Sequence, residues 1–187
     1  PNLVVSVGHP WYFSDKTIPD QDERRKNPIF NRINNSFNVQ TLITGGEVVS
    51  MSAKRYLFNY ERGYEKRHFE EWSDASADRY ENRFGKGREG TIMVEWAEGK
   101  PPIPFGSPVV QVGKGARKIN ISHIICEEYW IGTRFDGSAD NANYDRDNPL
   151  ARKARLFDIT VALNPNASPP VAGKIDKHYE LVKMASK

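Results

Sequence analysis

Apolar and polar residues alternate along two well-separated stretches of the chain. In residues 157–163 every second position is apolar, and Asp158 and Thr160 lie between the apolar side chains. Residues 119–126 follow the same pattern, although Ile124 places an apolar side chain on the opposite face. A period of two is typical of a strand that buries one face. The pattern therefore predicts two long strands, joined by a polar loop over residues 136–149.

A tight hairpin is predicted around Gly45 and Gly46. Residues 36–44 and 47–52 have strand-like composition and flank these two glycines. A two-residue Gly-Gly turn favours a hairpin because both turn positions need positive φ. In the register we expect, Val39, Thr41 and Ile43 lie against Ser52, Ser50 and Val48. Shorter strands are predicted at residues 3–7, 91–96 and 109–112, with the turn that contains His9 ending the first.

One principal helix is predicted over residues 61–77. Large side chains recur there at intervals of four, close to one helical turn: Tyr60, Tyr64, His68 and Trp72. The charged, glycine-containing stretch 78–90 that follows is predicted to be a loop.

Three segments have the composition of extended chain. Residues 14–35 form a polar arm, residues 100–108 a proline-rich linker, and residues 164–187 a C-terminal arm. Proline donates no backbone hydrogen bond, so the linker is expected to lie outside any sheet. The sequence thus predicts a mainly β (α+β) fold, with antiparallel sheets or a sandwich or barrel, in a single domain over residues 1–187.

The charge balance gives little support to nucleic-acid binding. The chain has 27 Lys and Arg against 24 Asp and Glu, for a net charge of +3. Two basic clusters could still contact a phosphate backbone. They consist of Arg24, Arg25 and Lys26, and of Arg152, Lys153 and Arg155. No run of about 18 apolar residues is present, so no membrane span is expected.

No catalytic residue, cofactor or metal ligand is predicted. Cys126, the single cysteine, falls in an apolar strand and is interpreted as a buried, inert thiol. Glu127 and Glu128 are expected on opposite faces of that strand, where they form no carboxylate pair. The four histidines lack zinc-site spacing. The Asp and Asn residues of loop 136–149 leave calcium open, although Arg146 stands where a calcium loop needs glycine.

One family resemblance rests on the order of these elements. A hairpin, an aromatic-rich helix ending in Phe69-Glu-Glu-Trp72, and a final strand at residues 156–163 resemble the tail-tube protein of contractile-tailed phages. The resemblance implies a β-built subunit that assembles with copies of itself. Together with the extended arms, it predicts a non-catalytic structural subunit of a viral or phage particle, a tail tube or capsid. Such a protein is made in the host cytoplasm and contacts itself and other particle subunits.

The alternative belongs to a different class. Residues 45–57 are similar to the segment before the first helix of RAMP-type backbone subunits in CRISPR effector complexes. This resemblance implies a ferredoxin-like sheet that binds guide RNA. In that case the two basic clusters would contact RNA, and binding would weaken steeply with salt.

Overall fold

The computed structural model describes residues 3–13, 36–57, 65, 68–88, 90–126, 128, 148–165 and 183. The predicted arm 14–35, most of loop 136–149, and nearly all of the C-terminal arm lie outside these residues. The strands are β1 (Val4–Tyr12), β2 (Ser36–Thr44), β3 (Glu47–Ala53), β4 (Thr91–Val94), β5 (Ile103–Gly106), β6 (Val109–Val112), β7 (Ile119–His123) and β8 (Val161–Leu163). The helices are α2 (Asp74–Phe84) and α4 (Pro149–Phe157), with a 3-10 turn, η3, at Gly115–Arg117.

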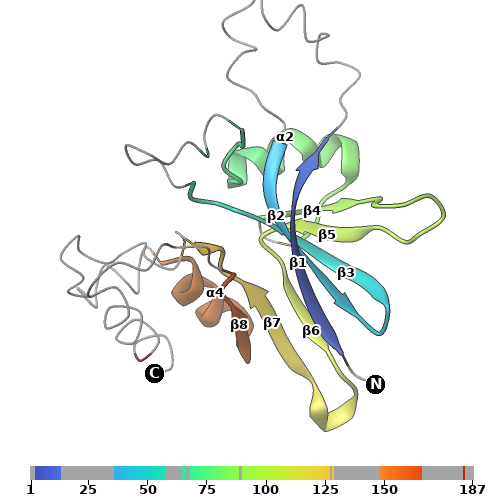
Figure 1. Ribbon diagram of the computed structural model, residues 1–187, viewed down its shortest axis with the longest axis vertical. Helices are drawn as coiled ribbons and strands as arrows, with labels where there is room; N and C mark the ends of the chain where they lie inside the picture. Colours follow the sequence, from blue (N-terminus) through green and yellow to red (C-terminus); the bar gives the residue numbers. More distant parts are fainter. Residues whose placement is uncertain are drawn as a thin grey trace, which may run out of the picture.

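The strands form two mixed sheets. One has the order β1-β2-β3-β5-β4 and the other β6-β7-β8, and the β3–β5 and β7–β8 pairs are parallel. Helix α2 lies at one end of the larger sheet, and α4 lies beside β7 and β8 (Figure 1). The predicted mainly β, α+β class is confirmed. The described strands contain parallel pairs and close no barrel, so a purely antiparallel or barrel arrangement is excluded for them.

The Gly45-Gly46 hairpin is confirmed, with one change of register. Both glycines have positive φ, 60° and 83°, and Ile43 lies opposite Val48 as expected. A bulge then shifts the pairing between Leu42 and Ile43. As a result Thr41 faces Met51 and Val39 faces Ala53, one residue beyond the predicted serine partners.

The helix predicted at 61–77 is confirmed only from Asp74 onward, and residues 61–64, 66 and 67 of that prediction lie outside the described residues. Residues 69–73 are not helical, and α2 starts at Asp74 and continues to Phe84 through the predicted loop. Ser73 is the N-cap: its hydroxyl accepts the Ser76 N–H, and the Ser76 hydroxyl accepts the Ser73 N–H. This reciprocal cap fixes the start of the helix after Trp72.

Helix α4 replaces part of a predicted strand. Asn148 caps its first turn by accepting the N–H groups of Leu150 and Ala151, and Pro149 occupies the first helical position. The helix runs through Phe157, so the strand predicted at 157–163 is reduced to β8.

Two prolines lie in strands where extended linker or turn was predicted. Pro104 is inside β5, opposite Met93, so the linker prediction is wrong at the centre of residues 100–108. β1 continues through His9 and Pro10 to Tyr12, although a turn was predicted there. β1 is an edge strand of the described sheet, and an edge tolerates proline because one side needs no ladder bond.

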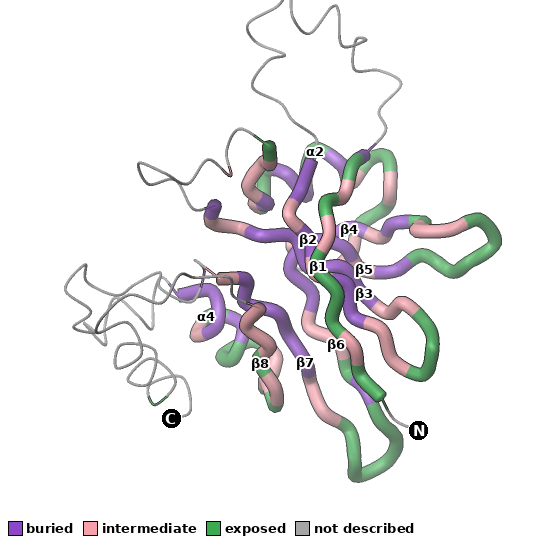
Figure 2. The backbone as a smooth tube through the Cα atoms, viewed as in Figure 1, coloured by how far each residue is buried: buried purple, intermediate pink, exposed green. Residues whose placement is uncertain are grey.

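The main core is aromatic. Phe105 packs against Phe13 at 4.9 Å and against Trp72 at 5.0 Å between ring centroids, and Phe37 and Tyr80 complete the cluster. A smaller cluster of Leu42, Val112 and Ile121 joins the two sheets. Buried positions concentrate in β2, β3 and β5, whereas β1 is exposed or half-buried (Figure 2). No helix in the described part of the chain has the length and apolar character needed to cross a membrane.

Candidate functional site

Cys126 lies in a strained turn directly after β7. The strand ends at His123, and Cys126 has a φ of 49° in the 3-10 turn that follows. Residues other than glycine rarely adopt a positive φ, and residues with this kind of backbone strain are often found at functional sites. The Cys126 N–H donates to the carbonyl of Pro165 at 3.1 Å and to Asn164 Oδ1 at 3.2 Å. Cys126 is half-buried and outside the strand, so its interpretation as a buried strand residue is wrong.

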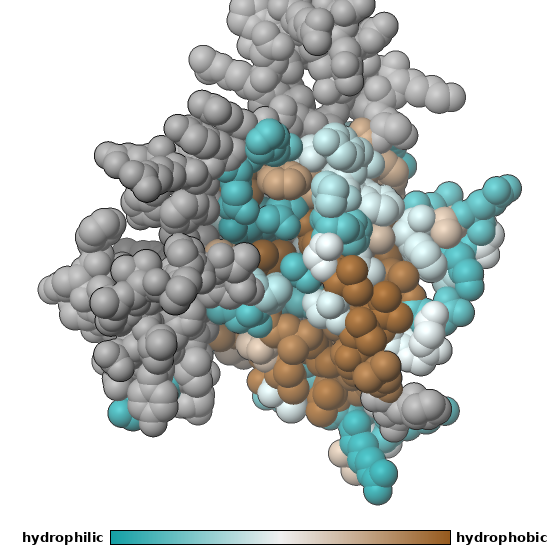
Figure 3. Space-filling model, in the orientation of Figure 1, coloured by the Kyte–Doolittle hydropathy of each residue, from teal (hydrophilic) through white to brown (hydrophobic). Residues whose placement is uncertain are grey.

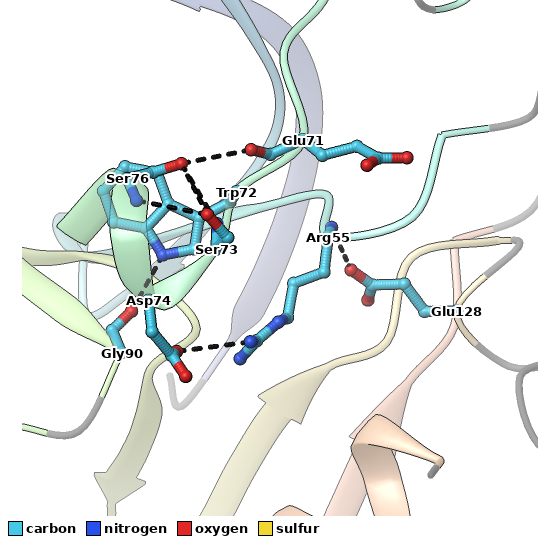
Figure 4. Close-up of polar contacts among 8 residues, drawn as sticks. All are labelled: Arg55, Glu71, Trp72, Ser73, Asp74, Ser76, Gly90 and Glu128. Atoms are coloured by element: carbon cyan, nitrogen blue, oxygen red, sulfur yellow. Dashed lines mark hydrogen bonds and ion pairs between the residues drawn. The ribbon is translucent and has the colours of Figure 1, made fainter.

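Glu128 fastens this turn from within. Its side chain is 3% exposed, and Oε2 accepts the Ile125 N–H at 2.7 Å. The Glu128 N–H also donates to the Ile125 carbonyl at 3.2 Å, so Glu128 binds both the N–H and the carbonyl of Ile125. Its second oxygen, Oε1, accepts the backbone N–H of Arg55 (Figure 4). The prediction that Glu128 sits on a strand face is therefore wrong.

This double contact brings two distant segments together. Two N–H groups bound to one carboxylate have nitrogens within about 8 Å of each other, given normal hydrogen-bond lengths. Arg55 directly follows Lys54, and Ile125 directly precedes Cys126. The Arg55 guanidinium also pairs with Asp74, at the start of α2, at 3.3 Å (Figure 4). The backbone at Cys126 is thus held close to the backbone at Lys54.

Lys54 is a buried cation with a fixed partner. It is 2% exposed, and its Nζ lies 2.6 Å from Glu65 Oε2. Glu65 Oε1 accepts the Asn38 amide at 3.0 Å. The Lys54 N–H donates to the Asn38 carbonyl, and its own carbonyl accepts the Trp72 N–H, both at 2.9 Å. Because a well-packed apolar pair is often at least as stable, a buried ion pair on a segment tied to the strained cysteine turn favours a functional role.

Lys153 places a buried positive charge at the end of β7, just before the Cys126 turn. Its Nζ donates to Ser122 Oγ at 2.8 Å and to the His123 carbonyl at 3.1 Å. Burial lowers the pKa of Lys153 to about 8, and the Glu128 carboxylate opposes that shift. Burial raises the pKa of Glu128, and the positive charge of Lys153 opposes this rise. Each charge therefore stabilises the other inside the protein.

His123 forms a neutral bridge among three strands. Its Nε2 lies 2.9 Å from Ser6 Oγ, and its Nδ1 lies 3.0 Å from Ser52 Oγ. Burial, with help from Lys153, lowers the pKa of His123 to about 4. The Ser6 hydroxyl donates to Gln40 at 3.1 Å, so it accepts from His123. In this arrangement His123 does not act as a base toward Ser6, and the pair is no nucleophilic dyad.

The predicted basic clusters have different outcomes. Arg152 and Arg155 lie exposed on α4. Lys153, on the same helix, is only 8% exposed and directs its ammonium to Ser122 and His123, so its predicted contact with nucleic acid is wrong. The other cluster, Arg24, Arg25 and Lys26, lies outside the described residues, as do the acidic residues considered for calcium.

Sequence reasoning missed Lys54, Cys126 and Glu128 as site residues. One signal was available: an apolar run ending abruptly in Cys-Glu-Glu marks the end of a strand, where functional side chains often lie. Lys54 also follows closely on the strand predicted at 47–52, after one intervening residue. Among the described residues, no three His, Cys, Asp or Glu side chains gather closely enough to hold a metal ion.

Comparison with known proteins gives a likeness of fold. No family model matches the chain, and no curated protein matches it. A solved structure of a glutamine-dependent NAD(+) synthetase from Cytophaga hutchinsonii superposes with a TM-score of 0.56 and 23% sequence identity. The match covers 99% of this chain and 21% of the synthetase chain, so this chain spans about a fifth of that protein's length.

This likeness corrects the predicted function. The chain shares its fold with part of an enzyme, so the expected non-catalytic structural subunit of a viral or phage particle is wrong. The ferredoxin-like sheet implied by the RNA-binding alternative is not found among the described strands, whose order in the larger sheet is β1-β2-β3-β5-β4. At this level of identity the comparison shows a shared fold and no more.

Proposed function

We propose that this chain is a thiol-dependent amide hydrolase that releases ammonia from the side chain of glutamine. The observation that carries the proposal is the positive φ of Cys126 in a turn that Glu128 fastens to the backbone of Arg55, the residue after the buried Lys54 of the Lys54–Glu65 pair. The substrate class comes from the name of the structural neighbour, a glutamine-dependent synthetase. An enzyme that takes nitrogen from glutamine must break the C–N bond of its carboxamide.

The reaction has two steps, both through Cys126. The thiol gives up its proton and attacks the carboxamide carbon, which forms a C–S bond; the C–N bond breaks, and the leaving nitrogen takes up the proton that the thiol lost and departs as ammonia. Water then adds to the thioester, the C–S bond breaks, and glutamate and the free thiol are released. Both steps pass through a tetrahedral oxyanion, which nearby positive charge and N–H groups stabilise.

Lys54 and Glu65 have distinct roles in this scheme. The Lys54 ammonium supplies the positive charge for the oxyanion in this scheme, since a fixed cation stabilises the charge that develops in the tetrahedral intermediate. Glu65 fixes the ammonium at 2.6 Å and is itself held by Asn38. The strained backbone suits this role by analogy with nucleophile elbows, in which a sharp turn after a strand presents the attacking atom at the end of a sheet.

The test is ammonia release from glutamine by the purified full chain. We expect Cys126→Ala to lower the rate by at least about 1,000-fold, as loss of a nucleophile does in other hydrolases. Glu47→Gln is the matched control, because Glu47 forms an exposed pair with Lys100 at 3.2 Å. A Cys126→Ala protein that releases ammonia as fast as the parent would exclude the proposal.

A further inference from the structure

We infer that Glu128 is a positioning residue, which holds the Cys126 turn on the Lys54 segment with Lys153 as its counter-ion. The catalytic part of this inference rests on the proposed function. The Glu128 carboxylate binds the backbone N–H groups of Ile125 and Arg55, so its effect on the reaction passes through the backbone of these two residues.

The chemistry of the contact requires a carboxylate. Each Glu128 oxygen accepts a different backbone N–H, one from each of the two segments. A glutamine at this position has one accepting oxygen, and its NH2 group would face the second N–H donor. Glu128→Gln therefore breaks the connection at one end while keeping the size of the side chain.

Helix α4 supports the same turn at two further points. Asn148, fully buried at the start of α4, donates its amide to the Glu128 carbonyl at 3.4 Å. One turn later along the helix, Lys153 places its charge near the Glu128 carboxylate and donates to the carbonyl of His123, just before the turn. The position of Cys126 thus depends on α4, a helix that carries no proposed catalytic group.

A purely structural ion pair is the competing explanation. If Glu128 served only to neutralise Lys153, removing both charges together would restore normal behaviour. If Glu128 positions the turn, Glu128→Gln/Lys153→Met would regain stability and still react abnormally. The double variant separates the two explanations, and it also provides a folded protein if Glu128→Gln alone unfolds.

The experiment measures two rates on the parent, Glu128→Gln, the double variant and the control Glu47→Gln. The first is kcat and KM for ammonia release from glutamine. The second is the rate of alkylation by iodoacetamide at pH 7, which reports on one site because Cys126 is the only cysteine. Urea unfolding of each variant shows which proteins are folded.

We expect kcat to fall at least 50-fold in both Glu128 variants, roughly the loss seen when a supporting contact is removed, with KM changed less than about threefold. Alkylation should slow at least fivefold in the same two proteins and stay unchanged in the control. Parent-like kcat and alkylation in the folded double variant would overturn the inference.

The alkylation rate needs no substrate, so it keeps the two proposals apart. If the parent releases no ammonia, the proposed function fails. Slowed alkylation in the Glu128 variants would then still support positioning of the Cys126 turn, and unchanged alkylation would overturn it. If the parent is active and Glu128→Gln keeps its full kcat, only the positioning role fails.

Discussion

At the scale of single residues, the backbone of Cys126 is unusual: among the described residues, only Cys126 and Asp158 have a positive φ without being glycine. A φ of 49° costs a cysteine about 1 kcal/mol and costs a glycine almost nothing. Four charged residues support this turn and its surroundings. Glu128 binds two backbone segments, Lys54 pairs with Glu65, and the positive charge of Lys153 favours the Glu128 carboxylate.

Two small substitutions at Cys126 test this conformation. Because glycine relieves the positive φ, we expect Cys126→Gly to be more stable than Cys126→Ala by about 1 kcal/mol. The free energy of unfolding in urea gives the difference directly. In an ordinary strand or helix the order reverses, so a more stable alanine variant would contradict the positive φ.

Protonation of His123 should weaken the protein in acid. Its pKa in the folded protein, about 4, is below the ordinary value of 6.5, so between these values the unfolded chain binds more protons. Stability from this group is complete above pH 6.5 and is lost as pH falls toward 4, to a total of about 3 kcal/mol. We expect the free energy of unfolding of His123→Gln to fall less than that of the parent between pH 7 and pH 4.5, as measured by urea unfolding at both pH values. Equal losses in both proteins would show that His123 is not the responsible group.

At the scale of secondary-structure elements, some strands and helices depend on residues adjacent in sequence, and others depend on contacts with distant segments. The hairpin of β2 and β3 depends on two adjacent glycines, whereas β5 depends on a close approach to Trp72 and Gly90. α4 depends on its cap at Asn148.

The Gly45-Gly46 turn should not tolerate β-branched residues. Both positions have positive φ and open space around them, so substitution strains the backbone without a steric clash. Replacing both with valine should cost about 2–4 kcal/mol. Thermal unfolding monitored by circular dichroism measures the loss, and Gly99→Val, a single positive-φ glycine in another turn, gives the cost for one position. A double variant as stable as the parent would mean that no tight turn is present.

Gly106 should tolerate no side chain at all. It has a φ of 122°, and an added Cβ would lie 2.6 Å from the Gly90 carbonyl and against the Trp72 ring. We expect Gly106→Ala to cost about 3 kcal/mol through overpacking and backbone strain, measured by urea unfolding. Unchanged stability would show that β5 and Trp72 are not in close contact.

Sequence patterns predicted the elements that local chemistry determines. The hairpin followed from glycine conformation, and its bulge was missed because alternation alone does not reveal an extra residue. The helix at 61–77 was misplaced because the four-residue spacing up to Trp72 outweighed the serine cap at Ser73. The site was missed for a different reason: Glu128 meets its partner Arg55 across 73 positions of the chain, and no local pattern contains that contact.

At the scale of the whole molecule, one edge of the larger sheet carries apolar side chains. β1 is an edge strand of the described sheet, and Leu3, just before the strand, is exposed together with Val4 and Val7 in its first half. An apolar area is visible on this face of the molecule (Figure 3). Long apolar edge strands tend to pair with another chain.

We propose that copies of the chain associate through β1. Val7→Lys places a charge on the β1 edge and should shift sedimentation toward the monomer. The control is Lys100→Met, on an exposed turn outside β1, which should leave the sedimentation of the protein unchanged. A parent protein that sediments as a monomer at every concentration would contradict association through this edge.

Mass spectrometry of the intact protein and of its proteolytic peptides, after mixing with glutamine and quenching in acid, tests the central claim most directly. If Cys126 is the nucleophile, the parent should carry an added glutamyl group on the peptide that contains Cys126, and Cys126→Ala should carry none. The adduct should disappear on longer incubation as water completes the reaction. An adduct on another residue, or ammonia release by a parent protein that never carries one, would contradict the proposed role of Cys126.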